Sequence, residues 1–81
     1  MIIVCDEPKR QANIVKHGID FAMIGPEFFL SAQIVPAKDA RWTAIGELDG
    51  VIVVIFATLG SEAISIISAR PASRKERTIW R

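Results

Sequence analysis

The sequence predicts an α+β domain, a small antiparallel sheet with helices packed on it. Two observations lead to this prediction. The first half contains helical segments with recognisable start and stop residues, and the second half contains strand-forming runs separated by turn residues. A chain of 81 residues corresponds to a single domain, residues 1–81, with one modest core.

The N-terminal segment predicts a strand followed by a helix. The apolar run IIVC, residues 2–5, indicates a short strand. Asp6 can cap a helix that has Pro8 in its first turn, reaches His17 and stops at Gly18. The apolar face of this helix is expected to consist of Ala12, Ile14 and Val15.

A second helical stretch, FAMIGPEFFL, begins after Asp20, which can cap it. Phe21, Ile24 and Phe28 have the spacing of one buried stripe, which favours core positions for these aromatic rings over a base-stacking role. Gly25-Pro26 interrupts the stretch and predicts a kink or two short turns.

The second half of the chain predicts a meander of antiparallel strands. The segment SAQIVPAKDA is a weak strand running into a loop, and stronger strands are expected at 41–47, 51–58 and 63–70. Asp49-Gly50 is a strong hairpin signal between the first two of these. Trp42 is expected in the core.

The third of these strands ends in a basic residue and leads into a last helix. Side-chain alternation predicts that Arg70 shares a face with Ile64, Ile66 and Ser68. Pro71 ends the strand. Ser73 and Glu76 then have the spacing of a capping box at the start of a C-terminal helix.

Charge is distributed unevenly. The formal net charge is +1, but residues 70–81 have +4 and residues 1–69 have −3. Such asymmetry indicates either a surface that faces an anion or the solvated face of a helix. The single cysteine, Cys5, is expected to be a buried, unreactive thiol, and one cysteine with one histidine makes a protein-built zinc site improbable. The sequence shows no signal peptide and its longest apolar run, 51–57, is too short to span a bilayer as a helix, so the cytoplasm is the expected compartment.

The basic C-terminal segment has the residue types of an RNA site. Arginine forks bind phosphate oxygens, and an exposed ring can stack on an unstacked base. RNA supplies its own nucleophile, the 2′-hydroxyl, so a protein needs only to position it, move its proton and stabilise the phosphate charge. His17 is the candidate for proton transfer, although the dipole of its helix also favours a histidine at that position. Motifs for other catalytic classes, a Gly-rich phosphate loop or a nucleophile elbow, are absent from the sequence.

The sequence resembles the BrnT family of bacterial toxins. The resemblance rests on Asp6, Lys9, Asn13, Lys16-His17-Gly18-Ile19 and Phe21, on Arg41 with Ile45-Gly46, and on residues 66–70 with Ala72, Glu76, Arg77 and Trp80. It implies a RelE-like fold and a ribonuclease toxin of a type II toxin–antitoxin pair that acts without metal or cofactor. It also implies a BrnA-like antitoxin with a ribbon-helix-helix fold, whose complex with the toxin binds operator DNA. Cys5 and Trp80 depart from the family, which usually has Trp and Tyr at these positions.

The resulting hypothesis is an endoribonuclease that leaves a 2′,3′-cyclic phosphate. The expected catalytic residues are Arg70, Arg77 and His17. The expected RNA-binding residues are Lys16, Arg41, Arg74, Lys75 and Trp80. One alternative is a catalytically inactive module that binds RNA or an antitoxin through the same surface. Another is a protein-only function, in which the basic helix docks on an acidic segment of an antitoxin.

Overall fold

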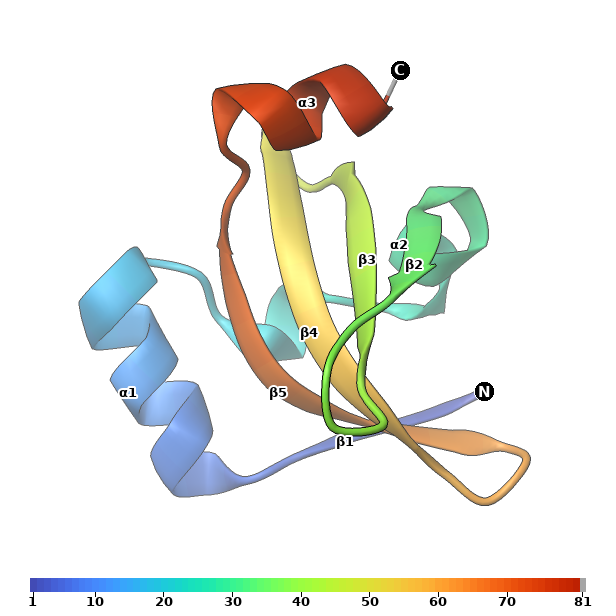
Figure 1. The fold of residues 1–81 in the computed structure, drawn as a ribbon. Coiled ribbons are helices and arrows are strands. Elements are labelled where there is room, and N and C mark those ends of the chain that lie inside the picture. The colour runs from blue at the N-terminus through green and yellow to red at the C-terminus, as the bar shows by residue number, and fades with distance from the viewer. Residues whose placement is uncertain (81) are drawn as a thin grey trace.

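The computed structural model describes residues 1–80 and confirms the α+β class (Figure 1). The five strands of its sheet are ordered β1-β5-β4-β3-β2. They are β1 (Ile2–Cys5), β2 (Gln33–Pro36), β3 (Trp42–Glu47), β4 (Val51–Leu59) and β5 (Ala63–Pro71). The helices are α1 (Glu7–His17), the 3₁₀ helix η1 (Phe21–Met23), α2 (Pro26–Ser31) and α3 (Arg74–Trp80). Arg81, part of the basic C-terminal segment, lies outside the described residues.

The sheet is mixed, which corrects the prediction of an antiparallel sheet. β2 to β5 form the expected antiparallel meander. β1, however, pairs in parallel with β5, with Ile3 opposite Ile64. This pair joins segments from the two ends of the chain, so no local signal in the sequence predicts it.

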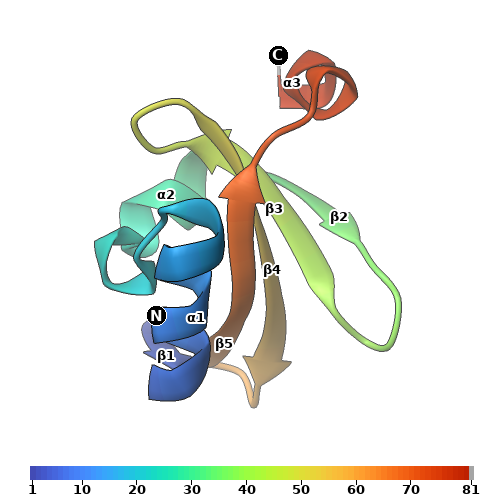
Figure 2. The same cartoon turned by 90° about the vertical axis from the view of Figure 1, so that its left-hand side faces the viewer.

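α1, η1 and α2 lie on one side of the sheet, which we call the helical face, and α3 lies on the other side (Figure 2). Phe21, Ile24 and Phe28 are all buried against the helical face, which confirms the predicted stripe. The interruption at Gly25-Pro26 is also confirmed, because η1 ends before it and α2 starts at Pro26. Short helices thus place three large apolar side chains over the central strands.

Gly46 lets the Phe28 ring of α2 approach β3 closely on the helical face. A Cβ atom built on Gly46 would lie 2.8 Å from Cε1 of Phe28 and 3.3 Å from Cβ of Ala32. We expect Gly46→Ala to lower the free energy of unfolding by about 1–3 kcal/mol, because the Phe28 ring must move within a packed core. Urea denaturation measures this change. Gly60→Ser is the control for a glycine outside the core, and its effect should come only from the positive φ of 64°.

The termini of α1 are as predicted, but its buried face is not. Asp6 accepts from the backbone N–H of Lys9, and Gly18, at φ 72°, closes the helix. Val15, expected in the core, is 89% exposed. Asn13 is buried instead, at 6% exposure. Its side chain accepts from the N–H of Ala69 at 3.1 Å and donates to the carbonyl of Ile19 at 2.9 Å.

Asn13 supplies a hydrogen-bond acceptor to β5 beyond the point where its neighbour β1 ends. The β1–β5 ladder ends at the Cys5–Ile66 pair, so Ala69, further along β5, has no β1 residue opposite it. The buried Ala69 N–H bonds to the Asn13 amide oxygen instead. A buried backbone donor needs such a partner, and this explains why a polar residue forms the inner face of α1.

A β-bulge in β5 changes the face on which Arg70 lies. Phe56 pairs with Ile66 and Ile55 pairs with Ser68, so Ile67 has no partner. Ile66 is therefore buried on the helical face, whereas Arg70 is opposite Val53 on the other face. The prediction that Arg70 shares a face with Ile64 and Ile66 was wrong, and the prediction that it shares a face with Ser68 is confirmed.

Two further predictions of burial were wrong. Trp42 is 38% exposed rather than in the core, because it opens β3 beyond the cover of the helices. Cys5 is exposed, because β1 is an edge strand and Cys5 is its last residue. Among residues 1–80 no helix is long and apolar enough to cross a bilayer.

Candidate functional site

The side of the sheet opposite α1 and α2 is only partly covered. We call it the open face and define it by Ile45, Val53, Ile55, Ser68 and Arg70. Ile45 and Val53 are buried where α3 packs across one end. Ile55 and Ser68, further from α3, remain partly exposed. The part of the open face that is partly accessible to solvent therefore consists of Ile55 and Ser68, with Arg70 next along β5 on the same face.

Arg70 is held by an ion pair on the open face. Its Nη1 and Nη2 donate to Oε1 and Oε2 of Glu76, each at 2.7 Å. Nη1 also donates to the carbonyl oxygen of Pro71 at 3.4 Å. The side chains of Arg70 and Glu76 are 39% and 22% exposed, so the pair lies at the surface but is not free in water.

Glu76 is fixed from its own helix as well. Its Oε1 accepts from the Ser73 N–H at 2.9 Å, while the Ser73 hydroxyl accepts from the Glu76 N–H at 3.2 Å. This confirms the predicted capping box at the start of α3. The hydrogen bonds from Arg70, helped by those from Ser73, lower the pKa of Glu76 from 4.5 to about 2. The same carboxylate thus caps the start of the helix and anchors the arginine.

The lowered pKa of Glu76 predicts a loss of stability in acid. The ionised carboxylate stabilises the folded state fully above pH 4.5, and this contribution disappears as the pH falls through about 2. We therefore expect the difference in Tm between the wild type and Glu76→Gln to shrink between these pH values. Thermal unfolding from pH 7 to pH 2 measures it, and a difference that stays constant with pH would contradict the assignment.

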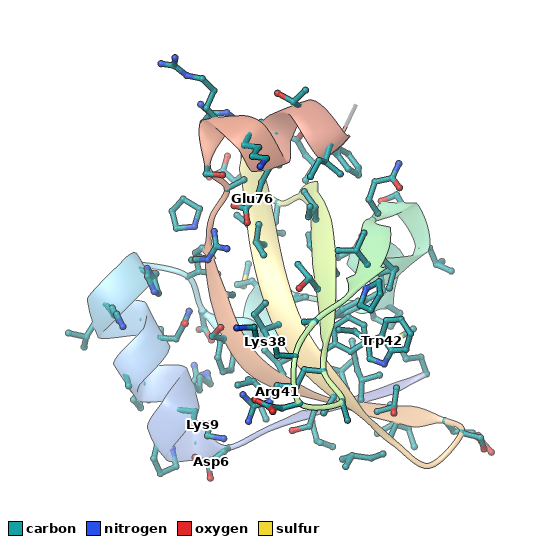
Figure 3. All side chains as sticks on the ribbon, viewed as in Figure 1. Asp6, Lys9, Lys38, Arg41, Trp42 and Glu76 are labelled. Carbon is teal, nitrogen blue, oxygen red and sulfur yellow. The ribbon has the colours of Figure 1, made fainter. Side chains whose placement is uncertain are left out.

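The turn between β2 and β3 brings two more cations to the side of the open face. The turn bends towards the side on which α3 lies (Figure 2). Lys38 and Arg41 lie on it, in front of the sheet, with Glu76 beyond them on α3 (Figure 3). Two backbone bonds, from Ala37 to Arg41 and from Arg41 to Lys38, close the turn. Arg41 was predicted as a phosphate contact, whereas Lys38 was missed because only the folded turn places it in front of the sheet, beside Arg41.

Arg77 lies in a different setting from Arg70. It lines a cavity of about 490 Å³ between the end of α1, the β3–β4 turn and the start of α3. Asp20 and Asp49 line the same cavity, and Arg70 does not. Asp20 is engaged by Arg10, whose hydrogen bonds lower the pKa of the Asp20 carboxyl. Arg77, expected as a catalytic residue together with Arg70, therefore lines a cavity to which Arg70 does not contribute.

The other predicted site residues are dispersed over the surface. His17 is half-buried in the last turn of α1, and among residues 1–80 no hydrogen bond links it to Arg70 or Arg77. Lys16 is exposed beside it, and Arg74 and Lys75 are exposed on α3. Trp80 packs partly against the buried cluster of Ile45, Val53 and Ala72. Trp80 thus anchors α3, and only its exposed part is open to a base.

In residues 1–80 no three His, Cys, Asp or Glu side chains form a group able to hold a metal ion.

Glu76 is a site residue that the sequence analysis did not identify as one. It was predicted only as a capping residue, although its hydrogen bonds to Arg70 make it part of the site. Arg70 and Glu76 both belong to the stretch that resembles the BrnT family, and that resemblance was the available signal, but no role at the site was predicted for Glu76.

Comparisons with known proteins agree on one family. A family model described as the ribonuclease toxin BrnT of type II toxin–antitoxin systems matches residues 5–76. The crystal structure of the Brucella abortus ribonuclease toxin BrnT is similar over 91% of this chain and 99% of that chain, with 56% identity and a TM-score of 0.86. No curated protein sequence matches.

Proposed function

Because this chain belongs to the BrnT family of ribonuclease toxins of type II toxin–antitoxin systems, we propose that it is a metal-independent endoribonuclease acting at the open face. The observation that supports this most directly is the position of Arg70. Its guanidinium lies on a partly exposed sheet face, held in one orientation by Glu76, with Lys38 and Arg41 on the same side (Figure 3). A guanidinium held in one orientation on a partly exposed surface, with two further cations on the same side, suits a phosphodiester.

The proposed reaction is an internal transesterification. The 2′-hydroxyl oxygen of RNA attacks the adjacent phosphorus, and the bond from phosphorus to the 5′-oxygen breaks. The 2′-hydroxyl loses a proton and the departing 5′-oxygen gains one, which gives a 2′,3′-cyclic phosphate and a 5′-hydroxyl. Arg70 stabilises the charge that builds on the phosphoryl oxygens and does not itself exchange a proton, because guanidinium remains charged.

The remaining residues are proposed to have secondary roles. Lys38, Arg41, Arg74 and Lys75 bind flanking phosphates, and the exposed part of Trp80 contacts a base. His17, Lys16 and Arg77 act on RNA only if it extends from the open face around the end of β5. Arg70 has a larger expected role than His17 or Arg77, because among the three only its side chain is held in one orientation by hydrogen bonds within residues 1–80.

The family also implies a partner. A type II toxin is neutralised by a protein antitoxin, and we propose a BrnA-like ribbon-helix-helix protein in this role. Operator DNA is bound only through the resulting complex, and the toxin acts in the cytoplasm without a membrane.

A second candidate function is an inactive module that binds RNA or the antitoxin without cleavage. The setting of Arg77 favours it, because that residue faces a cavity that does not contain Arg70. Such a module would bind RNA in a salt-dependent manner and form no products.

Cleavage of a labelled single-stranded RNA by the purified protein in EDTA separates the two functions. The proposal expects products that end in a cyclic phosphate and that are absent with an RNA carrying a 2′-deoxy substitution at the cleavage site. Cleavage that requires a divalent ion contradicts metal independence, and binding without products supports the inactive module.

A further inference from the structure

Arg70 has used only part of its hydrogen-bonding capacity. A guanidinium has five N–H donors. Glu76 takes one from Nη1 and one from Nη2, and the Pro71 carbonyl takes the second from Nη1. Among residues 1–80, no acceptor takes the Nε–H or the second Nη2–H. These two donors lie parallel along one edge of the planar group and form a second fork.

Arg10 has the same edge of its guanidinium occupied. Its Nε and Nη2 donate to the two carboxylate oxygens of Asp20, at 2.7 and 2.9 Å, and its Nη1 donates to Glu7 at 2.8 Å. The Nε–Nη2 fork that is open in Arg70 is therefore closed in Arg10. Arg10 links α1 to the capping residue of η1, and its Nε–Nη2 edge is not available to a ligand.

Glu76 is well placed to orient the open fork. It binds Arg70 end-on through both oxygens, and the capping box with Ser73 fixes its own position at the start of α3. An end-on carboxylate leaves the Nε–Nη2 edge free, whereas a carboxylate on that edge would block it, as Asp20 does in Arg10. The spacing of two guanidinium N–H groups matches that of two phosphate oxygens.

We propose that Glu76 is a positioning residue that holds Arg70 with its Nε–Nη2 edge directed at the scissile phosphate. The inference rests on the proposed ribonuclease function and adds the residue that orients its main cation. The carboxylate also cancels one positive charge, so it weakens the attraction for RNA while it fixes the geometry. Neutralising Glu76 should therefore weaken the orientation of Arg70 and lower kcat, while it strengthens the attraction of the site for RNA.

Steady-state cleavage by Glu76→Gln tests this opposition. We expect kcat to fall about 10- to 100-fold, while KM for RNA stays equal or decreases. Glu7→Gln is the matched control, because it neutralises a carboxylate that pairs with Arg10, at 2.8 Å, and leaves the Arg70–Glu76 pair intact. Its kcat per folded molecule should equal that of the wild type. An unchanged kcat in Glu76→Gln overturns the inference, and a higher kcat does so too, because Glu76 would then be a competitor of the phosphate.

A second measurement does not depend on cleavage. Inorganic phosphate is titrated into ¹⁵N-labelled wild-type protein while the arginine Nε–H signals are followed by NMR, with Arg70→Lys used to assign the Arg70 signal. We expect the Arg70 signal to shift and the Arg10 signal to stay, because the Nε–H of Arg10 donates to Asp20 whereas no acceptor among residues 1–80 takes that of Arg70. Equal responses or no response at Arg70 overturn the inference. If the Arg70 signal shifts selectively but the protein cleaves no RNA, the proposed ribonuclease function is overturned. The Nε–Nη2 fork of Arg70 then remains a phosphate-binding site.

Discussion

Arg70→Ala should lower kcat for RNA cleavage by about 10²–10³-fold, the usual cost of losing one preorganised donor to a transition state. The side chain combines a permanent charge with a fork held by two 2.7 Å hydrogen bonds, and no other described arginine on the open face has both. Single-turnover cleavage with saturating enzyme measures the chemical step apart from RNA binding.

Three variants separate the fork from simple charge. Arg70→Lys keeps the charge and should recover RNA binding but little of the rate, because an ammonium offers no planar fork. Arg74→Ala removes an exposed cation on α3 and should weaken binding at moderate salt with little change in kcat. Arg70→Ala with Glu76→Gln removes the stranded carboxylate and should stay inactive. Wild-type rates in Arg70→Ala would contradict the assignment of this residue to catalysis.

Asn13→Ala should cause a large loss of stability. It removes the partner of a buried N–H on β5 and of the Ile19 carbonyl after α1. Leaving such groups unpaired costs about 2–4 kcal/mol in total. This is a large fraction of the stability expected of a small domain, and it corresponds to a Tm roughly 10–30 °C lower.

Val15→Ala is the control on the same helix. Val15 looks like a core residue in the sequence but is 89% exposed, so its truncation should change the free energy of unfolding by less than about 0.5 kcal/mol. Urea denaturation of both variants ranks them. A Val15→Ala variant that is as unstable as Asn13→Ala would mean that α1 packs on the sheet through its apolar residues after all.

Local signals predicted most of the fold. Asp6 and Gly18 bound α1, Asp49-Gly50 joins two strands, and Ser73 starts α3, because each acts within a few residues of its position. The parallel pairing of β1 with β5 was not predicted, because it depends on segments some 60 residues apart, as in the Ile3–Ile64 pair. Asn13 was missed for the same reason, since its buried partner is on β5.

The sequence identified some residues of the candidate site but not how they are arranged. Arg70 and Arg41 were identified from charge and resemblance, and both lie on the side of the open face. Glu76 and Lys38 were added to the candidate site only from the structure. Glu76 meets Arg70 where the end of β5 lies against α3, and Lys38 is placed by the bend of the β2–β3 turn. The roles of His17 and Arg77 stay predictions.

The bulge at Ile67 takes up one residue that the alternation of side chains does not need. Ile66 pairs with Phe56 and Ser68 pairs with Ile55, so Ile67 adds to the length of β5 without a partner of its own. Deleting Ile67 would give a regular ladder, in which Arg70 stays opposite Val53 on the open face and Ala69 stays on the helical face. The loss of one codon at this position should therefore preserve the placement of the guanidinium, because the pairs on both sides of the bulge already have the register of an uninterrupted strand.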